Sequence, residues 1–247
     1  MKKLLLAMMC VGLLSCSNSN NNQTIDNQAS SSPVSLARTS NGVQSVDTGA
    51  SAPVTQSAQV ADAGYLVLDT ATQANVNKLN PVDVAPGKVK IVEFFSYACI
   101  HCYHVESQLD VWMAKHPNVE IQRVHVVWGN DSFKSLAKLN YTVKTMNLSS
   151  KINVAIFKAL FEEKLDLTNE AVLRQFLVKQ GVDTSQFFSI YNSFGASNIA
   201  NSNDVLTNAY GINNTPTFVV DNKYMTKPEL PDQLLQTLSV LVKKESK

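Results

Sequence analysis

Residues 91–102 of this 247-residue chain, with the sequence IVEFFSYACIHC, decide its fold. The stretch begins as an apolar run with strand character, and helical spacing follows Cys102, so the two cysteines lie where a strand gives way to a helix. The helix macrodipole and the free N–H groups favour the thiolate of Cys99 at such a helix N-terminus. Cys102 lies about one turn later, within reach of a disulfide. Because the thiolate is the attacking species, the stretch predicts thiol–disulfide exchange.

The segments around this motif predict a strand–helix–strand unit. Lys90–Ser96 is an apolar strand, Cys102–Lys115 is a helix with apolar residues at helical spacing, and Val119–Val127 is a second strand. Elements this close in sequence form a parallel strand pair with a right-handed crossover. Tyr65–Leu68 is a further short strand candidate, near the predicted start of the folded part.

The rest of the chain predicts a long helical block followed by a hairpin. Residues 132–210 have apolar residues at intervals of three and four, which is typical of amphipathic helices. Thr215–Val220 and Lys223–Met225 are the two strands of the hairpin, and Asp221-Asn222 is the tight turn between them. Pro228–Lys244 is a final amphipathic helix.

The N-terminus is typical of an export signal. Met1-Lys2-Lys3 gives a charged start, and the apolar stretch Leu4–Leu14 is shorter than the ~20 residues that a transmembrane helix needs. The signal ends in Leu13-Leu14-Ser15-Cys16, which resembles a bacterial lipobox. That resemblance implies that residues 1–15 are removed and that Cys16 carries lipid. An ordinary signal peptide that is cut nearby is the alternative.

Processing at Cys16 would change the cysteine count of the mature chain. The sequence has four cysteines, of which Cys10 leaves with the signal and Cys16 is blocked by lipid. Cys99 and Cys102 then remain as the free thiols. A single pair at this spacing in an exported protein indicates a catalytic disulfide rather than a structural one.

Residues 16–62 are predicted to be a flexible tether. They are dominated by Ser, Asn, Gln, Ala and Thr and contain no aromatic residue, so they cannot bury enough apolar surface to offset the entropy of ordering. The scattered apolar residues of Val43–Val60 leave an association segment as the alternative. Along the whole chain, 21 Lys and Arg balance 20 Asp and Glu, and no basic patch suggests a nucleic-acid partner.

Four features of the sequence occur together. They are Glu93–Ser96 before the motif, the Cys-X-His-Cys-Tyr sequence that ends at Tyr103, the helical block, and Thr215-Pro216 before an apolar strand. In this combination the chain resembles the DsbA-like thiol:disulfide oxidoreductases of the thioredoxin superfamily. The resemblance implies an α/β, thioredoxin-like fold with an inserted all-helical domain. Its thioredoxin-like part would comprise residues 63–131 and 211–247, and the insertion residues 132–210.

The resemblance also implies roles for the residues of the motif. Cys99 would be the nucleophile and Cys102 the buried resolving thiol. His101 would favour the Cys99 thiolate, which stabilises the reduced enzyme and makes its disulfide oxidising, an effect for which this family is a standard example. Ile100 stands where the best-known members have Pro, at a position that contacts substrate and tunes the redox potential.

Three further residues receive roles in the same way. Pro216 would form a cis peptide bond and lie against the two cysteines, and the backbone of Thr215 would then pair with an extended substrate segment. Glu93 would lie beneath the site and move protons to and from Cys102. A structural ion pair with Arg123 on the neighbouring strand is the alternative and is compatible with that role.

The remaining titratable candidates give no second site. His104 and His125 are predicted to be a helix-surface residue and a packing residue. Tyr103 occupies the position where haem attachment needs His, and one Cys pair supplies too few ligands for structural zinc. The sequence therefore predicts no metal and no cofactor.

These inferences predict an enzyme that introduces disulfides into newly exported proteins. Its partners would be unfolded proteins with cysteines and a membrane quinone-linked reoxidase or reductase. Its place would be the periplasmic side of a bacterial membrane, and Ser17 after the anchor favours the outer membrane. A disulfide isomerase or reductase is the alternative, because Thr before the cis-proline is common in isomerases. A non-catalytic peptide-binding lipoprotein would not need both thiols.

Overall fold

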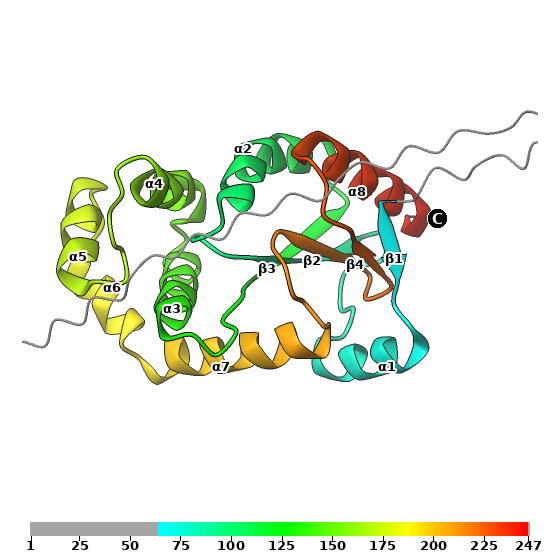
Figure 1. Ribbon diagram of the computed structural model, residues 1–247, viewed down its shortest axis with the longest axis horizontal. Coiled ribbons are helices and arrows are strands. Elements are labelled where there is room, and N and C mark those ends of the chain that lie inside the picture. The colour runs from blue at the N-terminus through cyan, green and yellow to red at the C-terminus, as the bar shows by residue number, and fades with distance from the viewer. Residues whose placement is uncertain (1–63, 247) are drawn as a thin grey trace, which may run out of the picture. The chain divides into compact units, whose positions relative to one another are not determined.

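A computed structural model describes residues 64–246 of the chain, which form a mixed five-stranded sheet with helices on both faces (Figure 1). The strand order is β1-β5-β4-β2-β3. The strands are β1 (Tyr65–Val67), β2 (Val89–Phe95), β3 (Val119–His125), β4 (Thr217–Val220) and β5 (Tyr224–Thr226). The predicted signal, the lipidation site Cys16 and the tether 16–62 lie outside the described residues.

Helices connect the strands and fill the long interval between β3 and β4. They are α1 (Thr70–Leu79), α2 (Ile100–Lys115), α3 (Asp131–Thr145), α4 (Ser149–Phe161), α5 (Glu170–Lys179), α6 (Thr184–Tyr191), α7 (Phe194–Ala209) and α8 (Pro231–Glu245). Of those within residues 64–246, none is long and apolar enough to cross a membrane.

Strand β2 is an interior strand of the sheet and carries the chain into the cysteine motif. It pairs in parallel with β3, with Glu93 opposite Arg123, and antiparallel with β4, with Glu93 opposite Phe218. Every residue of β2 is buried, because the strand has a neighbour on each edge and helices on each face. Helix α2 is the crossover between β2 and β3, so the predicted strand–helix–strand unit is confirmed.

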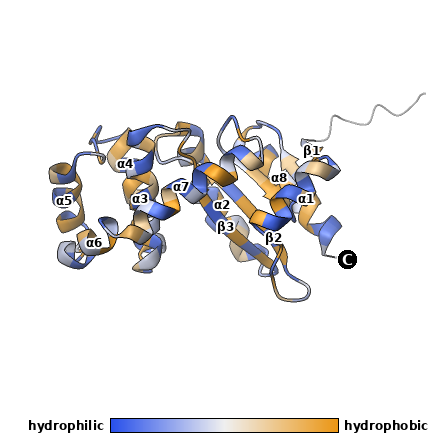
Figure 2. Ribbon diagram, turned by 90° about the horizontal axis from the view of Figure 1, so that it is seen from below, coloured by the Kyte–Doolittle hydropathy of each residue, from blue (hydrophilic) through white to orange (hydrophobic). Residues whose placement is uncertain are grey.

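The two faces of the sheet have separate cores. Ile91 and Phe218 pack with residues of α2 and α8, whereas Val92 and Phe94 pack with residues of α1 and the end of α7. Figure 1 shows these two pairs of helices on opposite sides of the sheet. This alternation follows from the period of two in a strand. The helices that cover the sheet show both orange and blue stretches in the hydropathy colouring, as expected for elements with one buried side (Figure 2).

Helices α3 to α7 surround a core of their own. This core contains Leu139, Ile156 and Phe157, and it extends to Tyr97 and Cys102 beside the cysteine motif. Side chains at the helix N-termini accept backbone N–H groups that have no partner within the helix. These caps are Asn130 for α3, Asn169 for α5, Asp183 for α6 and Ser193 for α7. The predicted helical character of this block is confirmed.

The structure contains one helix that was not expected, and the ends of several elements differ from the expectation by one to three residues. Helix α1 was not expected, because Val76 is its one buried residue and it therefore lacks an apolar period. Helix α8 begins at Pro231 rather than Pro228, and Pro231 occupies the first turn, where Pro is favoured. The hairpin is confirmed, and Asp221 and Asn222 both adopt positive φ angles at its turn.

Candidate active site

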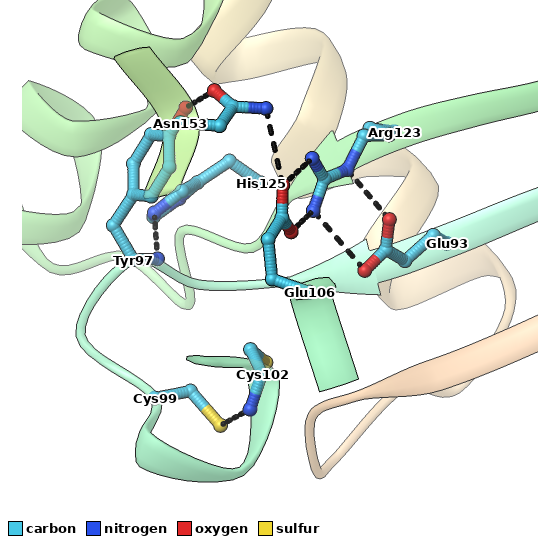
Figure 3. Close-up of polar contacts among 8 residues, drawn as sticks. All are labelled: Glu93, Tyr97, Cys99, Cys102, Glu106, Arg123, His125 and Asn153. Carbon is cyan, nitrogen blue, oxygen red and sulfur yellow. Dashed lines mark hydrogen bonds and ion pairs between the residues drawn. The ribbon is translucent and has the colours of Figure 1, made fainter. Parts of the chain in front are cut away.

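Cys99 is the N-cap residue of helix α2. Its backbone is extended, and its sulfur accepts the N–H of Cys102 at 3.3 Å (Figure 3). The same sulfur lies 3.3 Å from the carbonyl oxygen of Thr215. The N–H of Cys99 donates to the Ser96 carbonyl at 3.0 Å, which closes the turn between β2 and α2. The thiol therefore takes the place that a capping hydroxyl or carboxylate usually has.

These contacts lower the pKa of Cys99 to about 5, and the largest cause is the hydrogen bond from the Cys102 thiol. Partial burial opposes this shift, and hydrogen bonds from the Thr215 side chain and from the N–H groups of Cys102 and His101 add to it. Hydrogen bonds to the charged form favour it. Cys99 is consequently a thiolate at neutral pH.

Cys102 has the opposite environment, although it lies three positions further along the chain. It is buried, and burial is the largest cause that raises its pKa. The hydrogen bond to Cys99, the charge of Cys99 and the charge of Glu93 raise it further. Both thiols are free in this structure. Cys99 thus supplies the nucleophilic thiolate, and the Cys102 thiol stays protonated.

The loop before β4 faces the two cysteines. The Thr215-Pro216 peptide bond is cis, as predicted, and both residues are half-buried. The hydroxyl of Thr217 donates to the Asn214 carbonyl oxygen at 3.0 Å and holds the base of this loop. The fold therefore brings Cys99 and Thr215 together across 116 positions of sequence.

A buried ionic cluster lies beneath the cysteines. Arg123 Nε donates to Glu93 Oε2 at 2.6 Å, and Arg123 Nη1 donates to Glu106 Oε1 at 2.9 Å (Figure 3). Both carboxylates are buried, and 20% of the Arg123 side chain is exposed. The expected ion pair of Glu93 with Arg123 is confirmed. A second carboxylate shares the guanidinium, so the cluster carries an excess negative charge when both acids are ionised.

Burial raises the pKa of Glu93, and this is the largest influence on that carboxyl. The charge of Arg123 opposes the rise, and the charge of Glu106 adds to it. Two carboxylates that share a site cannot both ionise freely. The Glu93 carboxyl therefore binds a proton at a higher pH than an exposed glutamate does.

Hydrogen bonds extend the cluster to helix α4. Asn153 Nδ2 donates to Glu106 Oε1 at 3.3 Å, and the Tyr97 hydroxyl donates to Asn153 Oδ1 at 2.8 Å. Figure 3 shows this row of side chains between α4 and the two strands. The helical insertion is thereby tied to the loop that carries Cys99.

Glu106, Asn153 and Tyr97 are functional-site residues that the sequence analysis missed. Glu106 follows Cys102 by four positions and so lies on the same helical face, and an acid on a buried face is a signal that could have revealed it. Asn153 has no comparable signal, because its partners Glu106 and Tyr97 come from distant segments.

The other predicted residues lie near the motif but differ in their contacts. His101 is exposed on the first turn of α2, and it is its backbone N–H that helps to lower the pKa of Cys99. Ile100 begins the helix and is 38% exposed beside the thiols. His104 is exposed and His125 is fully buried, in line with their predicted surface and packing positions.

The chemistry of this site is dithiol exchange, since an activated thiolate and a protonated partner thiol lie within one helical turn. A strand, the two cysteines at a helix start and a cis-proline before an antiparallel strand are the thioredoxin arrangement. We therefore assign the chain to the thioredoxin-fold thiol:disulfide oxidoreductases.

Comparison with known proteins narrows this class to a family. The DSBA-like thioredoxin domain matches residues 90–239, and the chain belongs to that family. It is similar to the thiol:disulfide interchange protein DsbA of Burkholderia cepacia, with 37% identity over 162 residues that span 65% of this chain and 76% of the relative. The crystal structure of Pseudomonas aeruginosa DsbA is similar with a TM-score of 0.64 and 29% identity, over 74% of this chain and 92% of that one.

Proposed function

We propose that this protein is an exported, lipid-anchored oxidase that introduces disulfides into newly exported proteins through Cys99 and Cys102. The observation that carries the proposal is the place of Cys99 at the start of α2, where its sulfur accepts the N–H of Cys102 and its pKa is lowered to about 5. A thiol that prefers its ionised form stabilises the reduced enzyme and leaves readily, which makes the disulfide form oxidising.

The reaction would proceed by two exchanges. A substrate thiolate attacks the Cys99 sulfur of the oxidised enzyme; the Cys99–Cys102 bond breaks, a mixed disulfide forms, and Cys102 leaves and takes up a proton. A second substrate thiolate then attacks the substrate sulfur of the mixed disulfide, which forms the substrate disulfide and releases the Cys99 thiolate. Two electrons pass from substrate to enzyme, and a quinone-linked membrane reoxidase would remove them.

Glu93 would supply the proton that Cys102 needs when it leaves. Burial raises the pKa of Glu93, so the carboxyl can bind and release a proton closer to neutral pH than an exposed glutamate does. The charge of Glu93 acts on Cys102, so the two groups are close enough for their protonation to be linked. Thr215, Pro216 and Ile100 would hold an extended substrate segment beside Cys99, and the exposed imidazole of His101 would further favour its thiolate.

The remaining chain would place this site outside the cytoplasm. Residues 1–15 would be the signal, Cys16 the lipid anchor and residues 16–62 the tether. The catalytic domain would comprise residues 63–131 and 211–247, with residues 132–210 as its helical insertion. Cys16→Ser should abolish incorporation of a labelled fatty acid, whereas Cys10→Ser should retain it; incorporation in both variants would remove the anchor from the proposal.

A disulfide isomerase or reductase is the second candidate. It is favoured by Thr215 at the position before the cis-proline, where its carbonyl oxygen lies 3.3 Å from the Cys99 sulfur. Thiol alkylation in living cells separates the two functions. A Cys99–Cys102 pair that is mostly a disulfide supports the oxidase, and a pair that is mostly a dithiol supports the isomerase or reductase.

The decisive experiment is trapping of substrates in the full-length protein. Cys102→Ser removes the resolving thiol, so mixed disulfides between Cys99 and substrate proteins should accumulate and disappear on reduction. Cys99→Ser is the matched control and should trap none. If Cys102→Ser also traps none, the chain is a binding protein rather than an oxidoreductase.

A further inference from the structure

A short segment after β3 contacts both loops of the site. His125 is the last residue of β3, and Trp128 follows it by three positions. The ring of His125 forms a hydrogen bond with the loop that carries Cys99, and the ring of Trp128 forms one with the loop that carries Pro216. Neither side chain touches the sulfur atoms, so the proposed reaction does not use them directly.

His125 holds the cysteine loop through one backbone group. Its Nε2 accepts the N–H of Tyr97 at 3.0 Å, and its Nδ1 lies 2.8 Å from the carbonyl oxygen of Val126. Since Nε2 accepts, Nδ1 carries the proton and donates, which fixes the neutral tautomer. The imidazole is fully buried, so its contact with Tyr97 is protected from water. The side chain of Asn203 donates to the His125 carbonyl at 3.2 Å and fixes the strand end.

Trp128 holds the cis-proline loop in an equivalent way. Its indole N–H donates to the carbonyl oxygen of Ile212 at 3.1 Å, four positions before Pro216. The N–H of Ile212 is already bonded to Thr207, at the end of α7, at 2.9 Å. Trp128 therefore joins this loop to the segment that follows β3.

The backbone of Trp128 is strained where it makes this contact. Its φ of 46° lies in the left-handed region, which is rarely adopted by a bulky residue. Such conformations persist where surrounding contacts impose them, and they are frequent at functional sites. The ring is 39% exposed, so burial alone does not account for the strain.

The ring of Phe133 lies near the rings of both His125 and Trp128. Phe133, on the first turn of α3, lies with its ring centroid 6.4 Å from that of His125 and 5.9 Å from that of Trp128. The two hydrogen bonds thus start from one packed group of three rings rather than from independent supports. A shift of this group would move both loops.

We propose that His125 and Trp128 are positioning residues, which together set the separation between the Cys99 loop and the Thr215-Pro216 loop. The inference rests on the proposed function, because it concerns the reactivity of the same thiol. Loss of either hydrogen bond would loosen one loop and weaken the contacts that Thr215 makes with Cys99.

Trp128→Phe tests the proposal because it keeps an aromatic ring and removes the indole N–H. The second tryptophan gives a matched control: Trp112 Nε1 donates to Ser239 Oγ at 2.8 Å, between α2 and α8 and away from the loop contacts. Thiolate absorbance of the reduced protein would be followed against pH. We expect Trp128→Phe to raise the pKa of Cys99 by about half a pH unit, or roughly three-fold in the ionisation constant. Trp112→Phe should leave it unchanged.

His125 provides an independent test. His125→Leu removes the acceptor of the Tyr97 N–H, whereas His125→Gln can place an amide oxygen at the position of Nε2. We expect the Leu variant to raise the pKa of Cys99 and the Gln variant to restore part of the shift. If the Leu variant does not fold, the comparison of His125→Gln and Trp128→Phe with the wild type still decides the question.

The outcomes separate this inference from the proposed function. A wild-type Cys99 that titrates near 8.5, as an ordinary thiol does, would contradict the proposed oxidase itself. A wild-type pKa near 5, with Trp128→Phe no different from Trp112→Phe, would leave the oxidase intact and overturn the positioning role. A rise in the pKa of Cys99 in Trp128→Phe but not in Trp112→Phe supports the positioning role.

Discussion

The helical insertion and the sheet differ in the titratable groups that they bury. Within residues 131–209, the buried polar residues are neutral amides and hydroxyls, namely Asn140, Thr142, Asn153, Asn203 and Thr207. Around the sheet and α2, buried Lys90, Glu93, Glu106 and His125 are titratable. Both parts have well-filled apolar cores, so the difference does not follow from packing alone.

The two kinds of buried group differ in what their burial costs. Thr142 and Thr207 satisfy their hydroxyls within their own helices, on the carbonyls of Lys138 and Asn203, at little cost. Buried charges are expensive unless they are paired, and their pKa values shift. Three of the four titratable groups at the sheet belong to the network that reaches the cysteines. Buried groups with shifted pKa values of this kind cluster at functional sites.

The largest expected effect comes from removing the cation of the cluster. Arg123→Met leaves the buried carboxylates of Glu93 and Glu106 without a counter-charge, and should lower the free energy of unfolding by about 3–5 kcal/mol near neutral pH. Lys179→Met is the matched control in the insertion, because its ion pair with Glu163 is exposed and should contribute about 0–1 kcal/mol. Urea unfolding of the two variants measures the difference.

An equal loss in the two variants would remove the contrast between the regions. The loss in Arg123→Met should also shrink at lower pH, because protonation of Glu93 neutralises part of the unpaired charge. A cost that does not change with pH would mean that lost packing, not charge, explains it.

Much of the fold could be predicted from local patterns. The β2 run, the apolar periods of the helices and the Asp221-Asn222 turn each specify their own conformation. Cys99, Cys102 and Thr215-Pro216 form one site as the family resemblance implied. Helix α1 was missed because a helix with one buried residue has no amphipathic signal.

The charged part of the site could be predicted only in part. Glu93 and Arg123 lie opposite each other in the parallel register, so a correct strand pairing suggests their contact. Glu106 and Asn153 join them only after α2 and α4 have packed. Contacts of that kind depend on the angle and depth at which helices meet, which no sequence period encodes.

The second prediction concerns acid stability. Burial lowers the pKa of His125 to about 3, below the ordinary value near 6.5. The unfolded chain therefore binds a proton between those values while the folded chain does not, so stability is lost as pH falls. The expected loss from this group is about 2 kcal/mol between pH 7.5 and 5.

His125→Gln should remove that part of the pH dependence of unfolding. His104→Gln makes the same chemical change on the exposed face of α2 and should keep the wild-type slope. If the two variants have the same slope, the acid sensitivity arises elsewhere. The insertion carries no buried histidine among its described residues, so changes there should not affect the slope.

The smallest expected effect is at the Asn169 cap of α5, which we compare with the Cys99 cap of α2. Asn169 caps α5 with an amide oxygen, whereas Cys99 caps α2 with a sulfur that ionises. Asn169→Ala should lower the free energy of unfolding by about 1 kcal/mol at any moderate pH.

Because the folded pKa of Cys99 is depressed, the stability that its thiolate contributes is present at high pH and lost as pH falls through about 5. In the reduced protein, Cys99→Ala should therefore cost more near pH 7.5 than near pH 4.5, as measured by urea unfolding at both values. The same cost at both would mean that Cys99 is an ordinary cap, and that the contrast in buried titratable groups between the insertion and the sheet does not extend to this residue.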